Sequence, residues 1–110
     1  MKETADQARL GPEHRELLGQ VLDKWSLQVL DSLCERPQRF NELRRDLEGV
    51  SQKVLTDSLR SMEEDGIVTR TVYPEVPPRV EYALSQMGES MRPIIKAMED
   101  WGIAYKKSMQ

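Results

Sequence analysis

The residues best suited to chemistry lie on one face of the segment that follows Ser51. On a helical wheel of about 100° per residue, an apolar face is opposed by a polar one formed by Lys53, Thr56, Asp57 and Arg60, with Gln52 at its edge. Lys and Arg can bond guanine edges or phosphates, Gln can bond adenine, and a Thr methyl can meet a thymine methyl. This face therefore predicts contacts with duplex DNA, whereas a merely solvated helix face is the alternative.

The segments around this helix strengthen the first interpretation. A short helix over 40–47 and a turn at Gly49 precede a helix over 51–65, which Ser51 can cap while also facing a phosphate. Strands over 67–73 and 79–84 follow, joined by a proline-rich tip. We expect the apolar stripe of the 51–65 helix to contain Val54, Leu55, Leu59 and Met62. This order predicts a helix-turn-helix with a β-hairpin wing, in a fold that is mainly α (α+β).

Three further arginines are candidates for contact with the DNA. Arg39 and Arg70 are plausible clamps on the phosphate backbone. Arg79 stands beside Pro77 and Pro78 at the hairpin tip, and a narrow minor groove attracts arginine. The alternative for this tip is a rigid surface loop that carries an ordinary surface arginine.

Amphipathic helices are expected on both sides of this unit. The pattern predicts helices over about 12–23 and 25–35. In the second of these helices, Leu27, Leu30 and Cys34 are expected to face the core of the protein. It also predicts one long helix from Ser85, kinked at Pro93. We expect a dimer to form through both terminal helices, by the residues Leu17, Leu18, Val21, Ile94, Ile95, Met98, Trp101 and Tyr105. A homodimer would match a palindromic operator, although this stripe could instead belong to the core.

Length and charge set the outer limits. The 110 residues predict one domain, over 12–107, after a loose tail over 1–11. The net charge of −3 argues mildly against nucleic acid, but residues 36–79 carry 8 basic and 8 acidic side chains, so the deficit lies outside the proposed reading unit. No apolar run approaches the roughly 18 residues of a membrane span. A single cysteine fits a reducing compartment, and we expect a cytoplasmic protein.

Catalytic and metal-binding constellations are missing from the sequence. His14 is the one histidine and has no cysteine or acid cluster at ligand spacing. Neither a phosphate loop nor a G-x-S-x-G elbow occurs. We therefore expect no metal, no cofactor and no enzymatic activity.

Several motifs together resemble the HxlR family of bacterial winged-helix regulators. They are Lys24-Trp25 with Leu27 and Leu30, the run 39–44, the run 51–56, and above all the stretch from 64–70 through 73–82; Gly88 and Asp100-Trp101-Gly102 also fit. The resemblance covers about residues 12–104 and implies a MarR-like dimeric transcription factor that binds operator DNA. Redox-sensing members carry a cysteine just before the first helix, where this chain reads Gly11-Pro12-Glu13.

The sequence thus favours a sequence-specific DNA-binding regulator, and a repressor rather than an activator. A winged helix that binds a partner protein and not DNA is the alternative. Cys34 is expected to be a shielded core thiol and not the switch. The regulating signal would then be a small-molecule effector bound near Trp25 and the terminal helices, or the concentration of the protein itself.

Overall fold

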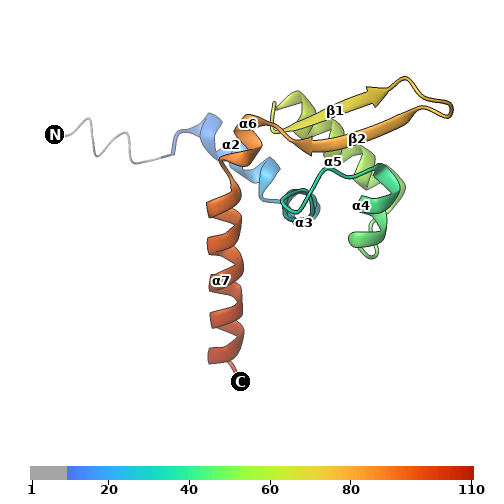
Figure 1. The fold of residues 1–110 in the computed structure, drawn as a ribbon. Coiled ribbons are helices and arrows are strands. Elements are labelled where there is room, and N and C mark those ends of the chain that lie inside the picture. Colours follow the sequence, from blue (N-terminus) through green and yellow to red (C-terminus); the bar gives the residue numbers. More distant parts are fainter. Residues whose placement is uncertain (1–9) are drawn as a thin grey trace.

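Helix α3 lies at the centre of the fold and contacts α2, α4, α5 and β2. The computed structural model describes residues 10–110. In chain order the elements are α2 (Pro12–Val21), α3 (Lys24–Leu33), α4 (Phe40–Asp46), α5 (Gln52–Glu64), β1 (Val68–Tyr73), β2 (Arg79–Leu84), α6 (Gln86–Glu89) and α7 (Arg92–Ser108). Helices α3, α4 and α5 and the β1–β2 hairpin form one unit, called the head below, and α7 stands away from it (Figure 1). The expected loose tail lies outside the described residues, apart from Leu10 and Gly11.

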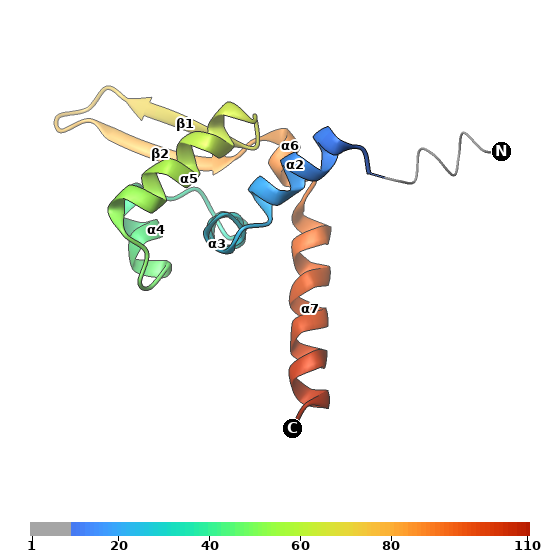
Figure 2. The ribbon, with the colours of Figure 1, turned by 180° about the vertical axis from the view of Figure 1, so that it is seen from behind.

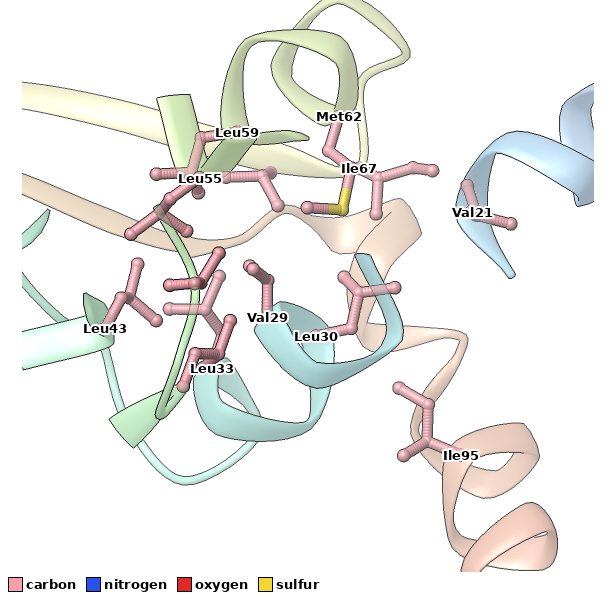
Figure 3. Packing of buried hydrophobic residues seen from close by; sticks show 13 residues of the cluster. Val21, Val29, Leu30, Leu33, Leu43, Leu55, Leu59, Met62, Ile67 and Ile95 are labelled. Atoms are coloured by element: carbon pink, nitrogen blue, oxygen red, sulfur yellow. The ribbon is translucent and has the colours of Figure 1, made fainter. Parts of the chain in front are cut away.

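The core joins the inner faces of α3, α4 and α5 to the base of the hairpin. Its members are Val21, Val29, Leu30, Leu33, Leu43, Leu47, Val50, Leu55, Leu59, Met62, Ile67, Val68 and Ile95. Figure 3 shows Leu30 of α3 between the α5 residues on one side and Val21 and Ile95 on the other. The expected inner stripe of α5 is therefore confirmed at three positions, Leu55, Leu59 and Met62.

Two expectations about the core need correction. Val54 is 38% exposed, because a rotation of about 100° from Leu55 carries it off the inner face. Leu27 and Cys34 are only half-buried, whereas the buried residues of α3 are Ser26, Val29, Leu30, Ser32 and Leu33. The packing of α5 against α3 selects a face that is rotated from the one that the sequence pattern predicts.

Local signals set the helix-turn-helix. Gly49 has φ of +93°, a conformation that glycine adopts at little cost. The Ser51 hydroxyl accepts a hydrogen bond from the Val54 N–H at 3.1 Å, as the sequence predicts. At the start of α3 a carboxylate caps the helix in the same way, because Asp23 Oδ1 accepts hydrogen bonds from the N–H groups of Trp25 and Ser26 at 3.0 and 2.9 Å. These caps fix where α3 and α5 begin.

The hairpin is tied to the helices by a contact that joins distant parts of the chain. Strands β1 and β2 pair antiparallel, with Tyr73 opposite Arg79 and Val68 opposite Leu84. Gln38, between α3 and α4, exchanges two backbone hydrogen bonds with Tyr82 on β2, at 2.9 and 2.8 Å. The Gln38 amide also donates to Ser32 O at 2.6 Å inside the core. The wing is therefore held in a set position relative to α4.

The C-terminal region differs from the single kinked helix that the sequence predicts. Ser85 caps the short α6, which ends at Glu89, and α7 begins at Arg92 with Pro93 in its first turn. A proline fits there because the first-turn N–H groups of a helix have no partner within the helix. A Cβ added to Gly88 would lie 2.3 Å from the Ile67 carbonyl oxygen, so α6 packs directly on the backbone that enters β1.

Candidate nucleic-acid interface

The outward face of α5 presents the side chains that the sequence singles out. Gln52, Lys53 and Arg60 are exposed and Thr56 is half-buried. Lys53 Nζ lies 2.9 Å from Asp57 Oδ2, and both side chains stay largely in solvent. An exposed pair of this kind contributes little to stability, about 0–1 kcal/mol, so Lys53 is easily released to another acceptor.

A hollow between α5 and the hairpin brings three predicted residues together. Thr56, Arg60 and Arg70 line it with Glu63 and Tyr82, and its volume is about 380 Å³. The arginines come from different elements, since Arg60 is on α5 and Arg70 is on β1. With two guanidinium groups and one carboxylate, the hollow is positively charged and suits an anion such as a phosphate.

A second hollow lies between the start of α4 and the hairpin, with a volume of about 640 Å³. Four arginines line it, namely Arg36, Arg39, Arg45 and Arg79. Glu42 Oε1 accepts the Arg39 N–H at 2.8 Å and lies 3.6 Å from Arg36 Nη1. These contacts lower the pKa of Glu42, the Arg39 N–H most of all, so Glu42 stays ionised at the start of α4. Within residues 10–110, Arg39, Arg60 and Arg70 make no salt bridge.

Arg79 has a different environment from the one that the sequence suggests. Its guanidinium lies 3.0 Å from Glu75 Oε2, 2.7 Å from Glu81 Oε2 and 3.8 Å from the centroid of the Tyr73 ring. The hydrogen bonds from Arg79 lower the pKa of Glu75, and the same contacts raise the pKa of Arg79. Arg79 thus closes the tip of the hairpin on itself, and its charge is already compensated.

The terminal helices carry an apolar surface outside the head. Ile94, Met98, Trp101 and Tyr105, called the α7 apolar face below, are 52%, 39%, 67% and 51% exposed. The Trp101 and Tyr105 rings stack with centroids 5.1 Å apart. Figure 2 shows α7 extending from the head on the same side as α2. On α2, Leu17 is exposed and Leu18 is half-buried.

Two residues of the expected dimer surface lie elsewhere. Val21 and Ile95 are 3% and 5% exposed and belong to the chain's own core. The same apolar stripe serves two purposes: the side of α7 that carries Ile95 packs against the head, and the adjoining side remains uncovered. The sequence pattern could not separate these two sides, because both are apolar.

Cys34 lies half-buried at the C-terminal end of α3. Burial raises the pKa of its thiol, although the nearby Arg92 acts in the opposite direction. The thiolate is the reactive form, so this environment lowers reactivity at neutral pH. His14 lies exposed on α2, and its Nδ1 accepts the Gly11 N–H at 3.2 Å.

No group of His, Cys, Asp and Glu among residues 10–110 could hold a metal ion. No helix in this range has the length and apolarity to cross a membrane.

The structure is a winged helix-turn-helix, with an exposed polar face on α5 and two arginine-lined hollows that both border the β1–β2 hairpin. Comparison with known proteins gives the family. Residues 20–110 match the HxlR-like helix-turn-helix family. The chain belongs to that family, and it is a helix-turn-helix transcriptional regulator.

Individual relatives agree with this assignment. The chain is 44% identical over 87 residues to the HTH-type transcriptional regulator YtfH of Escherichia coli (strain K12), covering 79% of this chain and 69% of the relative. Among solved structures, the transcriptional regulator YtfH from Salmonella typhimurium is 39% identical with a TM-score of 0.79, covering 89% of this chain and 87% of that one. The redox regulator HypR in its reduced form is 37% identical with a TM-score of 0.80, covering 86% and 94%.

Proposed function

We propose that this protein binds a palindromic operator as a homodimer and acts as a repressor. The observation that carries the proposal is the convergence of Thr56, Arg60 and Arg70 on one hollow beside the exposed face of α5. Arginines without salt-bridge partners in the described chain, on two elements that face the same space, suit an anionic backbone. Repression would follow if the bound dimer occludes a promoter.

Each side chain has a separate role in this proposal. Gln52 and Lys53 project from the first turn of α5, which is the end that reaches base edges in helix-turn-helix complexes. Thr56 can contact a thymine methyl. Ser51, which caps α5, can also contact a DNA phosphate. Arg60 and Arg70 are assigned to one phosphate group, and Arg39 to another at the start of α4. Arg79 would shape the wing and reach the minor groove only by exchanging its glutamate partners.

The homodimer is proposed from the α7 apolar face. A monomer seldom leaves a contiguous apolar surface of this kind uncovered, and Trp101 is 67% exposed. Twofold pairing of α7 helices would cover it and would place two α5 helices on successive half-sites, one DNA turn apart. Leu17 and Leu18 on α2 would extend this contact.

The test is the substitution Arg60→Ala, with Arg15→Ala on α2 as a charge-matched control. An operator is first selected from a random duplex pool, and affinity is measured by fluorescence anisotropy at two salt concentrations. Loss of a phosphate contact should weaken specific and non-specific binding alike and reduce the salt slope by about one. The control should bind as the unchanged protein does.

Two other results would change the proposal. A loss confined to one base pair of the operator would make Arg60 a base reader rather than a phosphate ligand. Normal folding with unchanged affinity for every duplex would remove this face of α5 from the interface. It would favour a winged helix that binds a partner protein.

A further inference from the structure

One buried residue, Gln38, joins three elements of the head. Gln38 lies between α3 and α4 and is 4% exposed. Its Nε2 group donates to the Ser32 carbonyl oxygen at 2.6 Å and to Ser32 Oγ at 2.8 Å, so both amide hydrogens are used at the end of α3. Ser32 Oγ in turn donates to Asp46 Oδ2, in the last turn of α4, at 2.6 Å. The Gln38 side chain is therefore fixed to α3 directly and to α4 through Ser32.

The backbone of the same residue holds the wing. The Gln38 N–H donates to the Tyr82 carbonyl oxygen at 2.9 Å, and the Tyr82 N–H donates to the Gln38 carbonyl oxygen at 2.8 Å. Figure 1 shows the segment between α3 and α4 beside β2. Across the hairpin, Tyr82 is paired with Arg70 of β1, and both line the hollow that also contains Arg60 of α5. A displacement of Gln38 would therefore pass through Tyr82 to Arg70.

Gln38 also adjoins the arginines beside α4. The next residue, Arg39, is the N-cap of α4 and lines the hollow between α4 and the hairpin. Gln38 is thus connected to one arginine in each hollow, by the chain to Arg39 and through β2 to Arg70. The phosphates of a duplex are spaced at fixed intervals. A protein therefore makes two phosphate contacts at once only if the two side chains are held at a matching separation.

We propose that Gln38 is a positioning residue that sets the separation of Arg39 and Arg70, so that both bind phosphates of one duplex. The backbone bridge fixes the wing to Gln38, and the side chain fixes Gln38 to the helices. Gln38 is buried and uncharged, so it acts only through the two arginines. The inference rests on the proposed function, because that function assigns both arginines to DNA phosphates.

A hydrogen-bonded anchor suits this task better than an apolar one. Hydrogen bonds have a preferred direction as well as a preferred distance. Among residues 10–110, no buried side-chain nitrogen or oxygen lacks a hydrogen-bond partner. A polar network that is fully satisfied specifies one arrangement of the elements that it joins. An apolar side chain at position 38 would fill the same space without fixing the direction of the segment.

The test substitution is Gln38→Met, which keeps the length of the side chain and removes both donors. It leaves no acceptor unpaired, because the Ser32 carbonyl oxygen still accepts the Glu35 N–H at 3.2 Å and the Ser32 hydroxyl still donates to Asp46. Gln38→Leu is a second variant of similar volume. The matched control is Ser26→Ala, which removes another buried hydroxyl of α3, far from the hairpin in the network of hydrogen bonds.

The first measurement is amide hydrogen exchange in the protein without DNA, resolved by residue with NMR. In Gln38→Met, the amides of residue 38 and Tyr82 should exchange several-fold faster, because the bridge opens more often when the side chain no longer holds it. The amide of Leu59, in the core of α5, should keep its rate, which excludes a general loss of stability. Ser26→Ala should leave the Tyr82 amide as it is in the unchanged protein.

The second measurement is affinity for the selected operator by fluorescence anisotropy over a range of salt concentrations. Gln38→Met should bind several-fold more weakly and reduce the salt slope by about one, as if a phosphate contact were lost, although it removes no charge. A variant that is only less stable has a smaller folded fraction. That lowers the apparent affinity by the same factor at each salt concentration and keeps the slope. Ser26→Ala should keep the slope of the unchanged protein.

A double-mutant cycle identifies the contact that is lost. Because Gln38→Met frees the hairpin and not α4, the lost contact should be that of Arg70. Arg70→Ala should then weaken binding less in the Gln38→Met protein than in the unchanged protein, whereas Arg39→Ala should weaken binding equally in both.

Four results would overturn the inference. They are an unchanged salt slope in the folded Gln38→Met protein, full additivity with Arg70→Ala, an unchanged Tyr82 exchange rate, and failure of both position-38 variants to fold, which would make Gln38 a requirement for folding. If only Gln38→Met fails to fold, Gln38→Leu carries the same measurements. Unchanged binding of every duplex by Arg39→Ala and Arg70→Ala would instead refute the phosphate contacts of the proposed function.

Discussion

The head and α7 differ in how far their apolar side chains are buried. In the head, Leu30 and Leu55 are 0% exposed, and each helix packs its apolar stripe on its neighbours. On α7, Trp101 and Ile103 are 67% and 63% exposed, and only Ile95 is buried. The head therefore has its apolar side chains covered within the chain, with Val21 of α2 and Ile95 of α7 completing the core, whereas the rest of α7 has a surface that the single chain does not cover. Stability should depend on the first region and assembly on the second.

The strongest way to break this distinction is to place charges on the α7 apolar face. Ile94→Asp combined with Trp101→Asp should give a folded monomer, because pairing would bury carboxylates in an apolar contact. Without the second half-site, operator affinity should fall by about 10³-fold or more, toward non-specific binding. Light scattering measures the molar mass of the variant, and fluorescence anisotropy measures its affinity for the operator. Lys106→Asp, on the last turn of α7, is the control that should leave both unchanged.

Ile95→Asp should have a different result although it lies next to Ile94. Its side chain is in the core, so the charge should unfold the protein rather than split a dimer. Circular dichroism would show this as lost helix content. A double variant of the α7 apolar face that unfolds as Ile95→Asp does, or an unchanged protein that is monomeric at micromolar concentration, would contradict the separation of the two regions.

A smaller effect is expected at the hairpin tip. Arg79→Ala removes the partner of Glu75 and Glu81 and leaves two carboxylates near the DNA backbone. It should weaken binding to all duplexes and reduce the salt slope by about one. Glu75→Gln should strengthen binding slightly, because it frees the guanidinium. If Arg79→Ala binds less well only to A·T-rich flanks, Arg79 reads groove width instead; no change on any duplex would exclude a DNA contact by the wing.

The smallest expected effect concerns Cys34. Burial raises the pKa of its thiol, and the sequence has no second cysteine with which a sulfenic acid could condense. Cys34→Ser should bind the operator normally, and mild peroxide should leave binding by the unchanged protein intact. An anisotropy loss in peroxide that Cys34→Ser resists would make this residue a redox sensor and would place the signal inside the head.

The sequence pattern was sufficient where a local signal decides the structure. Gly49, Ser51 and the alternation from Val80 to Leu84 each determine their own conformation, so the helix-turn-helix and the hairpin could be predicted within a residue or two. The polar face of α5 follows from the same periodicity. The residues that lie near this face in space cannot be predicted from the periodicity, because the approach of Arg70 to Arg60 depends on how the hairpin packs on α5.

Contacts between distant segments account for what could not be predicted. The backbone bridge from Gln38 to Tyr82 joins residues far apart in sequence, and no local signal predicts that these two residues pair. From the sequence alone, Arg79 is expected to be an unpaired cation. Only the hairpin register shows that Tyr73 lies opposite it. Ile94 and Ile95 are identical in type, and only the direction of α7 decides which is core and which is surface.

The tight contact at Gly88 has a mechanical consequence. Because any side chain there would collide with the Ile67 carbonyl, a larger residue at position 88 would push α6 away from the hairpin base. Only Ser90 and Met91 separate α6 from α7, so such a displacement would also shift the start of α7. The absence of a side chain at Gly88 is therefore needed for the position of α7 as well as for that of α6.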